Sequence, residues 1–260
     1  MSSIIREINQ LATNVGSPGA DLTILAEGNA AVLDSASDRF LVKASGVVMG
    51  EARESDWVWV SYSKTLEILE EAAKTGYQQK LEDALNQILK SATTDSGEIR
   101  KASIETLVHA VAFNLFGAVW SLHTHPTPVV ALASSLKAEE HFAGSVFPDE
   151  SVLCGPIPLF VPYAEPGLSL GLALFSASRD YIKRYGRSPG EIILGNHGLC
   201  TYGKVSQEAL ATTEMAVKAS RVRIGAMSAG GINFIPNNEA EKIAFRPDEV
   251  ARRKDLTQGL

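Results

Sequence analysis

The spacing of hydrophobic positions changes along the chain and predicts an alternation of helices and short strands. Residues 2–15 carry Ile4, Ile5, Ile8 and Leu11 at helical spacing, which predicts an amphipathic helix. Three β-rich runs follow, each bounded by Gly, Asp or Ser, and together they predict an antiparallel meander. These runs are LTILAEGNAAVLD (22–34), RFLVKAS (39–45) and DWVWVSY (56–62).

The rest of the chain alternates helical and extended patterns and shows no internal repeat. Helices are expected over 64–92 with a break at KTGYQ, 103–116 capped by Ser103, 127–142, 169–186, and 206–230 capped by Ser206. Strands are expected over 118–124, within the Pro-rich stretch 154–167, and twice around a turn in 191–203. We therefore predict a mixed α/β fold with a central, largely antiparallel sheet flanked by helices. One domain is expected over residues 1–230, followed by a polar C-terminal tail, 231–260, of unassigned role.

Composition and charge narrow the class of protein. Hydrophobic residues make up 45% and charged residues 21%, which is typical of a globular chain. The net charge of −6 predicts neither a nucleic-acid partner nor attraction to an anionic membrane. Cys154 and Cys200 lie far apart with no CxxC pattern, as in proteins of a reducing compartment. Without a signal peptide or an apolar run of about 18 residues, a cytoplasmic location is expected.

The stretch SLHTHP, residues 121–126, places two of the five histidines of the chain directly after an apolar run. On an extended backbone His123 and His125 point to the same side, about 6–7 Å apart. Two interpretations are about equally favoured: a pair of strand histidines that bond to their neighbours, and two ligands of one metal ion.

A metal site needs a third ligand, for which His109, His141 and His197 are the candidates. His197 is favoured because it also follows an apolar strand and precedes a glycine, where the backbone can turn sharply. Three histidines with one open position are typical of catalytic zinc. Glu105 shares a helix face with His109, and its simplest role is to interact with the helix N-terminus; only a nearby metal would make it a general acid or base.

Five short motifs in this order resemble the class II aldolase/adducin family. They are EGNAAV, LVKASGVVMG, SIETLVHA, WSLHTHP and LGNHGLCTYG. The resemblance spans about residues 5–225, and KASIETLVHA…HTHP looks most like the aldolase part of rhamnulose-phosphate aldolase/dehydrogenase fusions. It implies a three-layer domain and a homotetramer with its sites between subunits.

The resemblance also implies roles for individual residues. His123, His125 and His197 match the zinc ligands of the family, and Glu105 matches its proton-transferring carboxylate. Tyr163 resembles a tyrosine that reaches the site of a neighbouring subunit and acts on the aldehyde oxygen. The remaining matches fall on phosphate-binding loops: Gly28, Asn29, Ser45, Gly46 and Ser103. Lys43 adds charge there in one interpretation, and is a solvated strand lysine in another that is about as well supported.

The activity implied is that of a zinc-dependent aldolase, with Mn²⁺ or Co²⁺ as possible substitutes. It would reversibly cleave a sugar 1-phosphate of the fuculose or rhamnulose type into dihydroxyacetone phosphate and an aldehyde, through a metal-stabilised enediolate. Same-fold epimerases, decarboxylases and dehydratases, or a non-catalytic adducin-like assembly protein, are the alternatives. Ala102 replaces a hydroxyl residue of the phosphate motif, which weakens phosphate recognition unless Lys43 or Lys101 supplies it. No GxGxxG follows a strand, so no nicotinamide binding is expected.

Overall fold

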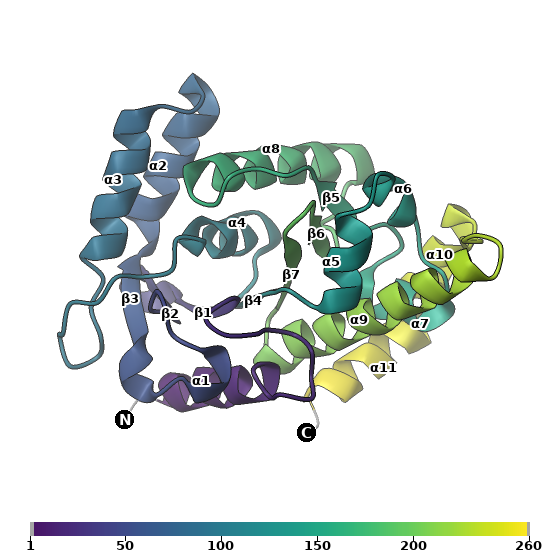
Figure 1. Ribbon diagram of the computed structural model, residues 1–260, viewed down its shortest axis with the longest axis horizontal. Helices are drawn as coiled ribbons and strands as arrows, with labels where there is room; N and C mark the ends of the chain where they lie inside the picture. Colours follow the sequence, from purple (N-terminus) through teal and green to yellow (C-terminus); the bar gives the residue numbers. More distant parts are fainter. Residues whose placement is uncertain (1–2, 259–260) are drawn as a thin grey trace.

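In the computed structural model, which describes residues 3–258, seven strands form one sheet in the order β3-β2-β1-β4-β7-β6-β5 (Figure 1). Neighbouring strands pair antiparallel throughout the described chain except for β5 with β6. The predicted mixed α/β fold with a largely antiparallel sheet is thus confirmed. The strands are β1 (Asn29–Asp34), β2 (Arg39–Lys43), β3 (Trp57–Ser61), β4 (Trp120–Thr124), β5 (Leu159–Val161), β6 (Ile192–Leu194) and β7 (Gly198–Gly203).

Helices cover both faces of the sheet and give three layers. On one face lie α1 (Ser3–Val15) and α9 (Ser206–Ser228), and on the other α2 (Tyr62–Thr75), α3 (Gln79–Lys90), α4 (Thr106–Phe116) and α8 (Leu168–Tyr185) (Figure 1). The remaining helices gather beside α9 at one end of the molecule. They are α5 (Thr127–Ala133), α6 (Ala138–His141), α7 (Pro148–Cys154), α10 (Asn237–Ala244) and α11 (Pro247–Gln258).

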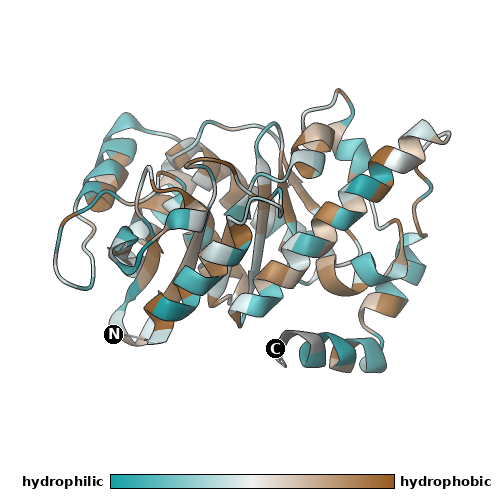
Figure 2. Ribbon diagram, turned by 60° about the horizontal axis from the view of Figure 1, so that its bottom comes forward, coloured by the Kyte–Doolittle hydropathy of each residue, from teal (hydrophilic) through white to brown (hydrophobic). Residues whose placement is uncertain are grey.

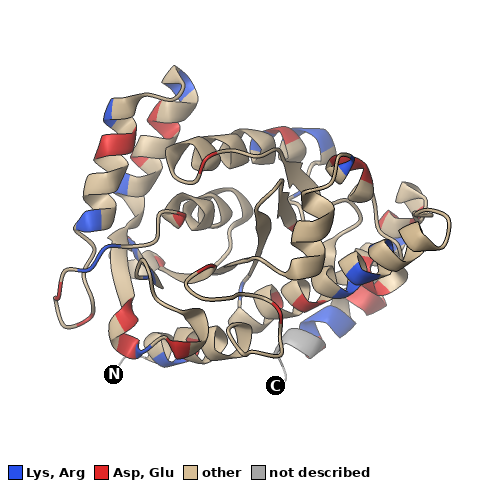
Figure 3. Cartoon of the chain, viewed as in Figure 1, with Lys and Arg blue, Asp and Glu red and all other residues tan. Residues whose placement is uncertain are grey.

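Side chains alternate between the two faces of each strand, so the sheet separates its two largest apolar clusters; a third, smaller cluster lies around α5. In β3, Trp57 and Trp59 pack with α1, whereas Val58 and Val60 pack with the helices of the opposite layer. Trp120 of β4 joins the first cluster, and all three tryptophans are buried. The helices carry hydrophobic and hydrophilic stripes (Figure 2), and charged residues concentrate on the outer helices and loops (Figure 3). Among the described helices none combines the length and apolar character needed to cross a bilayer.

The predicted helix over 127–142 is two helices, because residues 134–137 do not continue it. Ser135 Oγ donates to the carbonyl of Leu132 at 2.8 Å, which competes with helical bonding of that carbonyl. Leu136 is fully exposed, so continuing the helix would bury no apolar side chain there. The polar tail beyond residue 230 contains two helices, α10 and α11.

Both predicted hydroxyl caps are wrong. The backbone of Ser103 is held at the end of β2, where its N–H donates to the carbonyl of Lys43, so α4 begins only at Thr106 with Glu105 as its N-cap. Val205 is the N-cap of α9, and the hydroxyl of Ser206 donates to Glu7 of α1 instead.

A buried ion pair joins α9 to α7. Arg223 Nη2 lies 2.5 Å from Glu150 Oε1 and also donates to the carbonyl of Gly144 at 2.8 Å, while Nε donates to the carbonyl of His141 at 2.8 Å. Glu191, directly before β6, is also fully buried, and its Oε2 has no hydrogen-bond partner among the described residues. Burial, reinforced by the Glu150 carboxylate, raises the pKa of Glu191 to about 8 despite the opposing charge of Arg223.

The raised pKa of Glu191 gives a testable dependence of stability on pH. A carboxyl whose pKa is higher in the folded chain stabilises the fold below the unfolded value of 4.5, and this contribution is lost as the pH rises through about 8. In Glu191→Gln the side chain is neutral at every pH. We expect the unfolding free energy of the unmodified chain, relative to Glu191→Gln, to fall between about pH 5 and pH 8 in urea titrations. The exposed Glu139→Gln should show no such trend; a pH-independent difference for Glu191→Gln would contradict the assignment.

A second prediction compares two glycines. A Cβ on Gly198 in β7 would lie 2.5 Å from the carbonyl oxygen of Thr124 and 2.9 Å from His125 Cδ2. Gly198→Ala should therefore lower the unfolding free energy by about 1–3 kcal/mol. Gly225 on α9 has open space around it, so Gly225→Ala should raise stability by about 0.5–1 kcal/mol. Urea unfolding midpoints measure both changes in stability. If both substitutions changed stability equally, β7 and β4 would have room for a side chain at Gly198.

Candidate metal centre

Four side chains meet at one end of the sheet. Glu105, His123, His125 and His197 each offer one ligand atom, and these atoms lie within 4.8 Å of one another. Glu105 Oε1 is 2.7 Å from His197 Nε2 and 3.2 Å from His123 Nε2, and the Nε2 atoms of His123 and His125 are 2.9 Å apart. Ring centroids are separated by 4.7–5.1 Å. The four groups thus direct their ligand atoms toward a common point.

Strand pairing brings these groups together from distant parts of the sequence. His123 lies in β4, opposite Asn29 of β1 and Cys200 of β7, and His125 follows the end of β4. His197 lies in the tight connection between β6 and β7. Glu105 is the N-cap of α4, which packs against β4.

Close backbone approach at two glycines makes this arrangement possible. Gly28 has φ +68°, and a Cβ there would lie 2.4 Å from the methyl of Thr23 and 3.0 Å from the carbonyl oxygen of His123. Gly198 is confined between β7 and the end of β4, as described above. Glycine is therefore required on both sides of His123.

The outer ring nitrogens of two histidines fix which nitrogen carries the proton. His123 Nδ1 lies 3.1 Å from the carbonyl oxygen of Leu199, and His125 Nδ1 lies 3.2 Å from Glu27 Oε2. A carbonyl and a carboxylate only accept, so the neutral rings are protonated on Nδ1. Each Nε2 then presents a lone pair to the cluster, as in histidines that ligate metals.

Burial and mutual charge shape the titration of the cluster. Burial alone would raise the pKa of Glu105, but the neighbouring His123 and His197 hold it well below its usual range. Burial opposes charge on His123, but Glu105 and Cys200 outweigh it and hold its pKa above the ordinary value. Burial, with the charge of the neighbouring histidines, lowers the pKa of His125 to about 3. The cluster therefore keeps Glu105 ionised and His125 neutral.

The donor set fits a divalent cation. Nitrogen ligands about 2.05 Å from a tetrahedral zinc lie about 3.3 Å from one another, close to the shortest separations here. When both rings are neutral and protonated on Nδ1, the two Nε2 lone pairs face each other at 2.9 Å and need a proton or a metal cation between them. Three imidazoles and a carboxylate also accept Mn²⁺ or Co²⁺. Glu105, His123, His125 and His197 are thus consistent with a divalent metal site.

Two cavities meet at the cluster and share Glu27, His125 and His197. The smaller, about 330 Å³, is lined on its other side by polar side chains such as Lys43 and Ser45 together with glycines and small apolar residues. The larger, about 540 Å³, combines small apolar groups such as Val130 and Ala131 with hydroxyls. A ligand larger than one cavity would therefore span the cluster.

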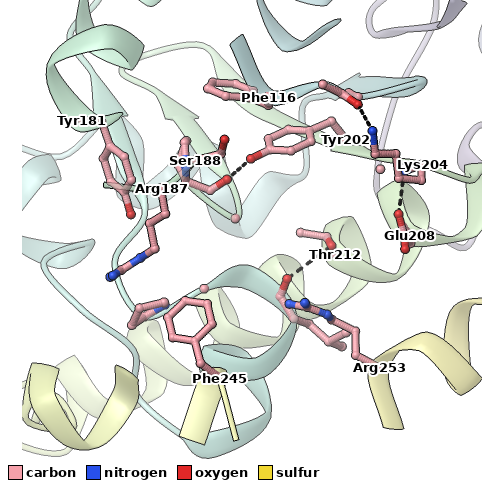
Figure 4. A pocket seen from close by; sticks show the side chains of 18 residues that line it. Phe116, Tyr181, Arg187, Ser188, Tyr202, Lys204, Glu208, Thr212, Phe245 and Arg253 are labelled. Atoms are coloured by element: carbon pink, nitrogen blue, oxygen red, sulfur yellow. Dashed lines mark hydrogen bonds between the residues drawn. The ribbon is translucent and has the colours of Figure 1, made fainter. Parts of the chain in front are cut away.

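A third cavity, about 300 Å³, lies at the far end of β7 and contains none of these four side chains (Figure 4). Several of its polar side chains are engaged by the protein itself, although the buried Nε of Arg187 has no partner among the described residues. Arg187 pairs with Glu241 at 2.8 Å, Lys204 Nζ donates to the carbonyl of Gly117, and the Tyr202 hydroxyl donates to the carbonyl of Pro189. The cavities beside the histidines are therefore the better candidates for a functional site.

Most residues predicted for phosphate line the smaller cavity: Gly28, Asn29, Lys43, Ser45, Gly46 and Ser103. Ser45 and Gly46 are exposed there. Asn29 is buried, and its amide donates to Glu105 Oε2 at 2.8 Å and Ser103 Oγ at 3.3 Å.

Lys43 and Tyr163 occupy opposite environments. Lys43 is 2% exposed and donates to the carbonyls of Ala26 at 3.0 Å and Val47 at 2.5 Å; burial lowers its pKa to about 8. The interpretation of Lys43 as a solvated strand lysine is therefore wrong. Tyr163 is 62% exposed and lines neither cavity at the cluster.

Two residues near the site were not assigned these positions from the sequence. Glu27 accepts a hydrogen bond from His125. It lies in the motif EGNAAV, but nothing in the sequence relates that motif to His125. His109, a candidate third ligand, instead bonds Asn29 and Ser121 behind the cluster. The four-residue spacing from Glu105, which places both side chains on one helix face, was the only sequence feature that linked His109 to the site.

Residues 16–224 match the family model of the class II aldolase and adducin N-terminal domain, and the chain belongs to this family. Solved structures share the fold at low identity. L-fuculose 1-phosphate aldolase is 17% identical with a TM-score of 0.69, covering 94% of this chain and 95% of that one. YgbL, a proposed aldolase/epimerase/decarboxylase from Klebsiella pneumoniae, is 18% identical with a TM-score of 0.66, covering 92% and 97%.

A third solved structure also shares the fold. The N-terminal class II aldolase domain of a conserved protein from Thermoplasma acidophilum is 22% identical with a TM-score of 0.62, covering 86% of this chain and 95% of that one. Among curated proteins, none matches the chain significantly. The comparisons therefore establish the family and the fold.

The cluster geometry predicts the effect of removing one imidazole. His197→Ala should lose bound metal because a ligand disappears and Glu105 loses its 2.7 Å partner. Metal content after dialysis against a zinc buffer, measured by elemental analysis, should fall from about one ion per chain to near zero. His141→Ala, on α6 and outside the cluster, is the matched control and should retain the metal. Normal metal content in His197→Ala would exclude His197 from the site.

Proposed function

We propose that the chain is a divalent-metal-dependent aldolase, with zinc as the favoured ion. It would reversibly cleave a ketose 1-phosphate of the fuculose or rhamnulose type into dihydroxyacetone phosphate and an aldehyde. The observation that carries this proposal is the convergence of three imidazole Nε2 atoms and one carboxylate where two cavities meet. The family and the L-fuculose 1-phosphate aldolase fold support the same chemistry.

The cluster supplies the polarising centre of the reaction. His123, His125 and His197 would hold the cation, which supplies Lewis-acid polarisation of a substrate carbonyl when bound. Leu199 and Glu27 keep the two outer ring nitrogens bonded, so the imidazoles are oriented in advance. Binding energy is then not needed to arrange the ligands during catalysis.

Glu105 is the proposed acid and base. It would remove the proton alpha to the polarised carbonyl for carbon–carbon bond formation, and return a proton to that carbon after cleavage. The neighbouring histidines hold the pKa of Glu105 well below its usual range, which weakens the base. Substrate that separates the carboxylate from these histidines would raise the pKa and restore its basicity.

The two cavities provide places for the two halves of the substrate. We assign the phosphate to the smaller cavity, where Lys43, Ser45, Gly46 and Ser103 offer an ammonium group, hydroxyls and a backbone amide. The aldehyde part would lie in the larger cavity beside Val130 and Ala131.

Tyr163 is proposed to act in the site of a neighbouring subunit. Because its side chain is exposed and lies outside both cavities, we assign it to the site of a neighbouring subunit in a homotetramer, where it would act on the aldehyde oxygen. The segment 231–260 is proposed as an addition to the domain over 1–230.

The test pairs metal analysis with release of dihydroxyacetone phosphate from a panel of ketose 1-phosphates. The unmodified chain should contain about one zinc ion and release the product from at least one sugar. Glu105→Gln keeps a side-chain oxygen and should keep the metal, but we expect turnover to fall by at least about 100-fold because the amide cannot take the proton. Exposed Glu139→Gln is the matched control and should retain full activity.

Each other outcome selects a different function. Metal without release from any sugar would overturn the aldolase proposal and favour the epimerase, decarboxylase or dehydratase chemistry of related folds. A chain without metal would favour an adducin-like assembly protein. Unchanged turnover in Glu105→Gln would exclude Glu105 as the base.

A further inference from the structure

A row of buried polar side chains runs from β4 through α4 and β1 to the cluster. Ser121, His109 and Asn29 are each at most 1% exposed. Ser121 Oγ lies 2.8 Å from His109 Nδ1, His109 Nε2 bonds Asn29 Oδ1, and Asn29 Nδ2 lies 2.8 Å from Glu105 Oε2. The row therefore ends on the carboxylate oxygen that faces away from the histidines.

The direction of every hydrogen bond in this row follows from the ionised carboxylate. Glu105 Oε2 accepts only, so the amide nitrogen of Asn29 must face it. Asn29 Oδ1 then faces His109 and needs a donor, which requires a proton on His109 Nε2. A neutral imidazole protonated there accepts at Nδ1, so the hydroxyl of Ser121 donates to it. Burial lowers the pKa of His109 to about 3, in agreement with a neutral ring.

The geometry points to His109 as a positioning residue: it locks the Asn29 amide so that its nitrogen faces the Glu105 carboxylate. Both hydrogens of the Asn29 amide are already engaged, one by Glu105 and the other by Ser103 Oγ. With Oε2 held by Asn29, Glu105 presents the single oxygen Oε1 to His123 and His197. His109 thus controls the orientation of Glu105 through Asn29, without touching the cluster.

This inference rests on the cation centre of the proposed function but not on the aldol reaction. It adds a role for Asn29, which the family resemblance placed on a phosphate-binding loop. It also explains a buried histidine that is not part of the cluster, since leucine or phenylalanine could fill the same volume but could not donate to Asn29.

The test compares two substitutions of His109 in the full chain. His109→Gln places an amide nitrogen near the position of the lost Nε2 and can still donate to Asn29 Oδ1. His109→Leu fills the space without a donor. Co²⁺ is the probe, because its visible spectrum reports ligand geometry and its titration gives affinity without any turnover.

We expect His109→Leu to bind Co²⁺ about 10–100-fold more weakly and with an altered spectrum, as for other partners behind metal ligands. His109→Gln should keep most of the affinity and the spectrum of the unmodified chain. Wild-type affinity and spectrum in His109→Leu would overturn the inference. Equal losses in both variants would also overturn it, since the donor would then not be the relevant property.

A second measurement needs no variant and holds even if His109→Leu fails to fold. Long-range ¹H–¹⁵N spectra of the histidine-labelled chain should show His109 as a neutral ring protonated on Nε2; a ring protonated on Nδ1 would overturn the inference. If both measurements give the expected results while no ketose 1-phosphate releases dihydroxyacetone phosphate, the role of His109 stands and the aldolase proposal alone fails.

Discussion

Mutual repulsion of electron pairs is the constraint on which the rest of this site depends. Three imidazole nitrogens and one ionised carboxylate oxygen crowd together in a buried place, and once the inner nitrogens are deprotonated their electron pairs repel one another unless a cation lies between them. The protein meets this constraint with acceptors behind two of the rings, Leu199 and Glu27, and a donor behind the carboxylate, Asn29. The cluster is therefore held from outside, which is what a cation-binding arrangement requires.

The fold supplies this outer support through strand pairing. Asn29, His123 and Cys200 are register partners across β1, β4 and β7, so the central strands fix the height of the site along the sheet. Helix α4 contributes Glu105 at its start and His109 one turn later, both facing the same layer. The partial positive charge at the start of α4 further favours an ionised Glu105. The sheet and the layer that contains α4 together fix the position of the Glu105 carboxylate.

Much of the fold was predictable because the spacing of hydrophobic residues along the chain sets the type and the buried face of most helices and strands. The two-residue alternation in β3 and the helical spacing in α1 both match their observed faces. The break after Ala133 and the late start of α4 were not predictable, because they depend on a hydroxyl bonding Leu132 and on Ser103 being held at the end of β2. Such hydrogen bonds do not alter the spacing of hydrophobic residues, so the sequence pattern does not reveal them.

The histidine pair and its companion His197 were accessible from spacing and family resemblance, but their supports were not. Glu27 meets His125 from a loop nearly one hundred positions earlier, and Asn29 meets His109 from a different layer. The family resemblance implied only that Asn29 lies on a phosphate-binding loop. Its actual partners are set by a tertiary contact, which no short motif records.

The charge of the smaller cavity links cation binding to phosphate binding in the proposed function. Its lining holds two carboxylates, Glu27 and Glu105, against one ammonium, Lys43, whose own hydrogens already reach two carbonyls. A phosphate dianion entering such a space meets a net negative wall. A divalent cation at the adjoining histidines adds two positive charges and reverses the sign of this field. For a phosphorylated substrate, cation binding would therefore be a condition for anion binding, so the same four side chains would control recognition as well as chemistry.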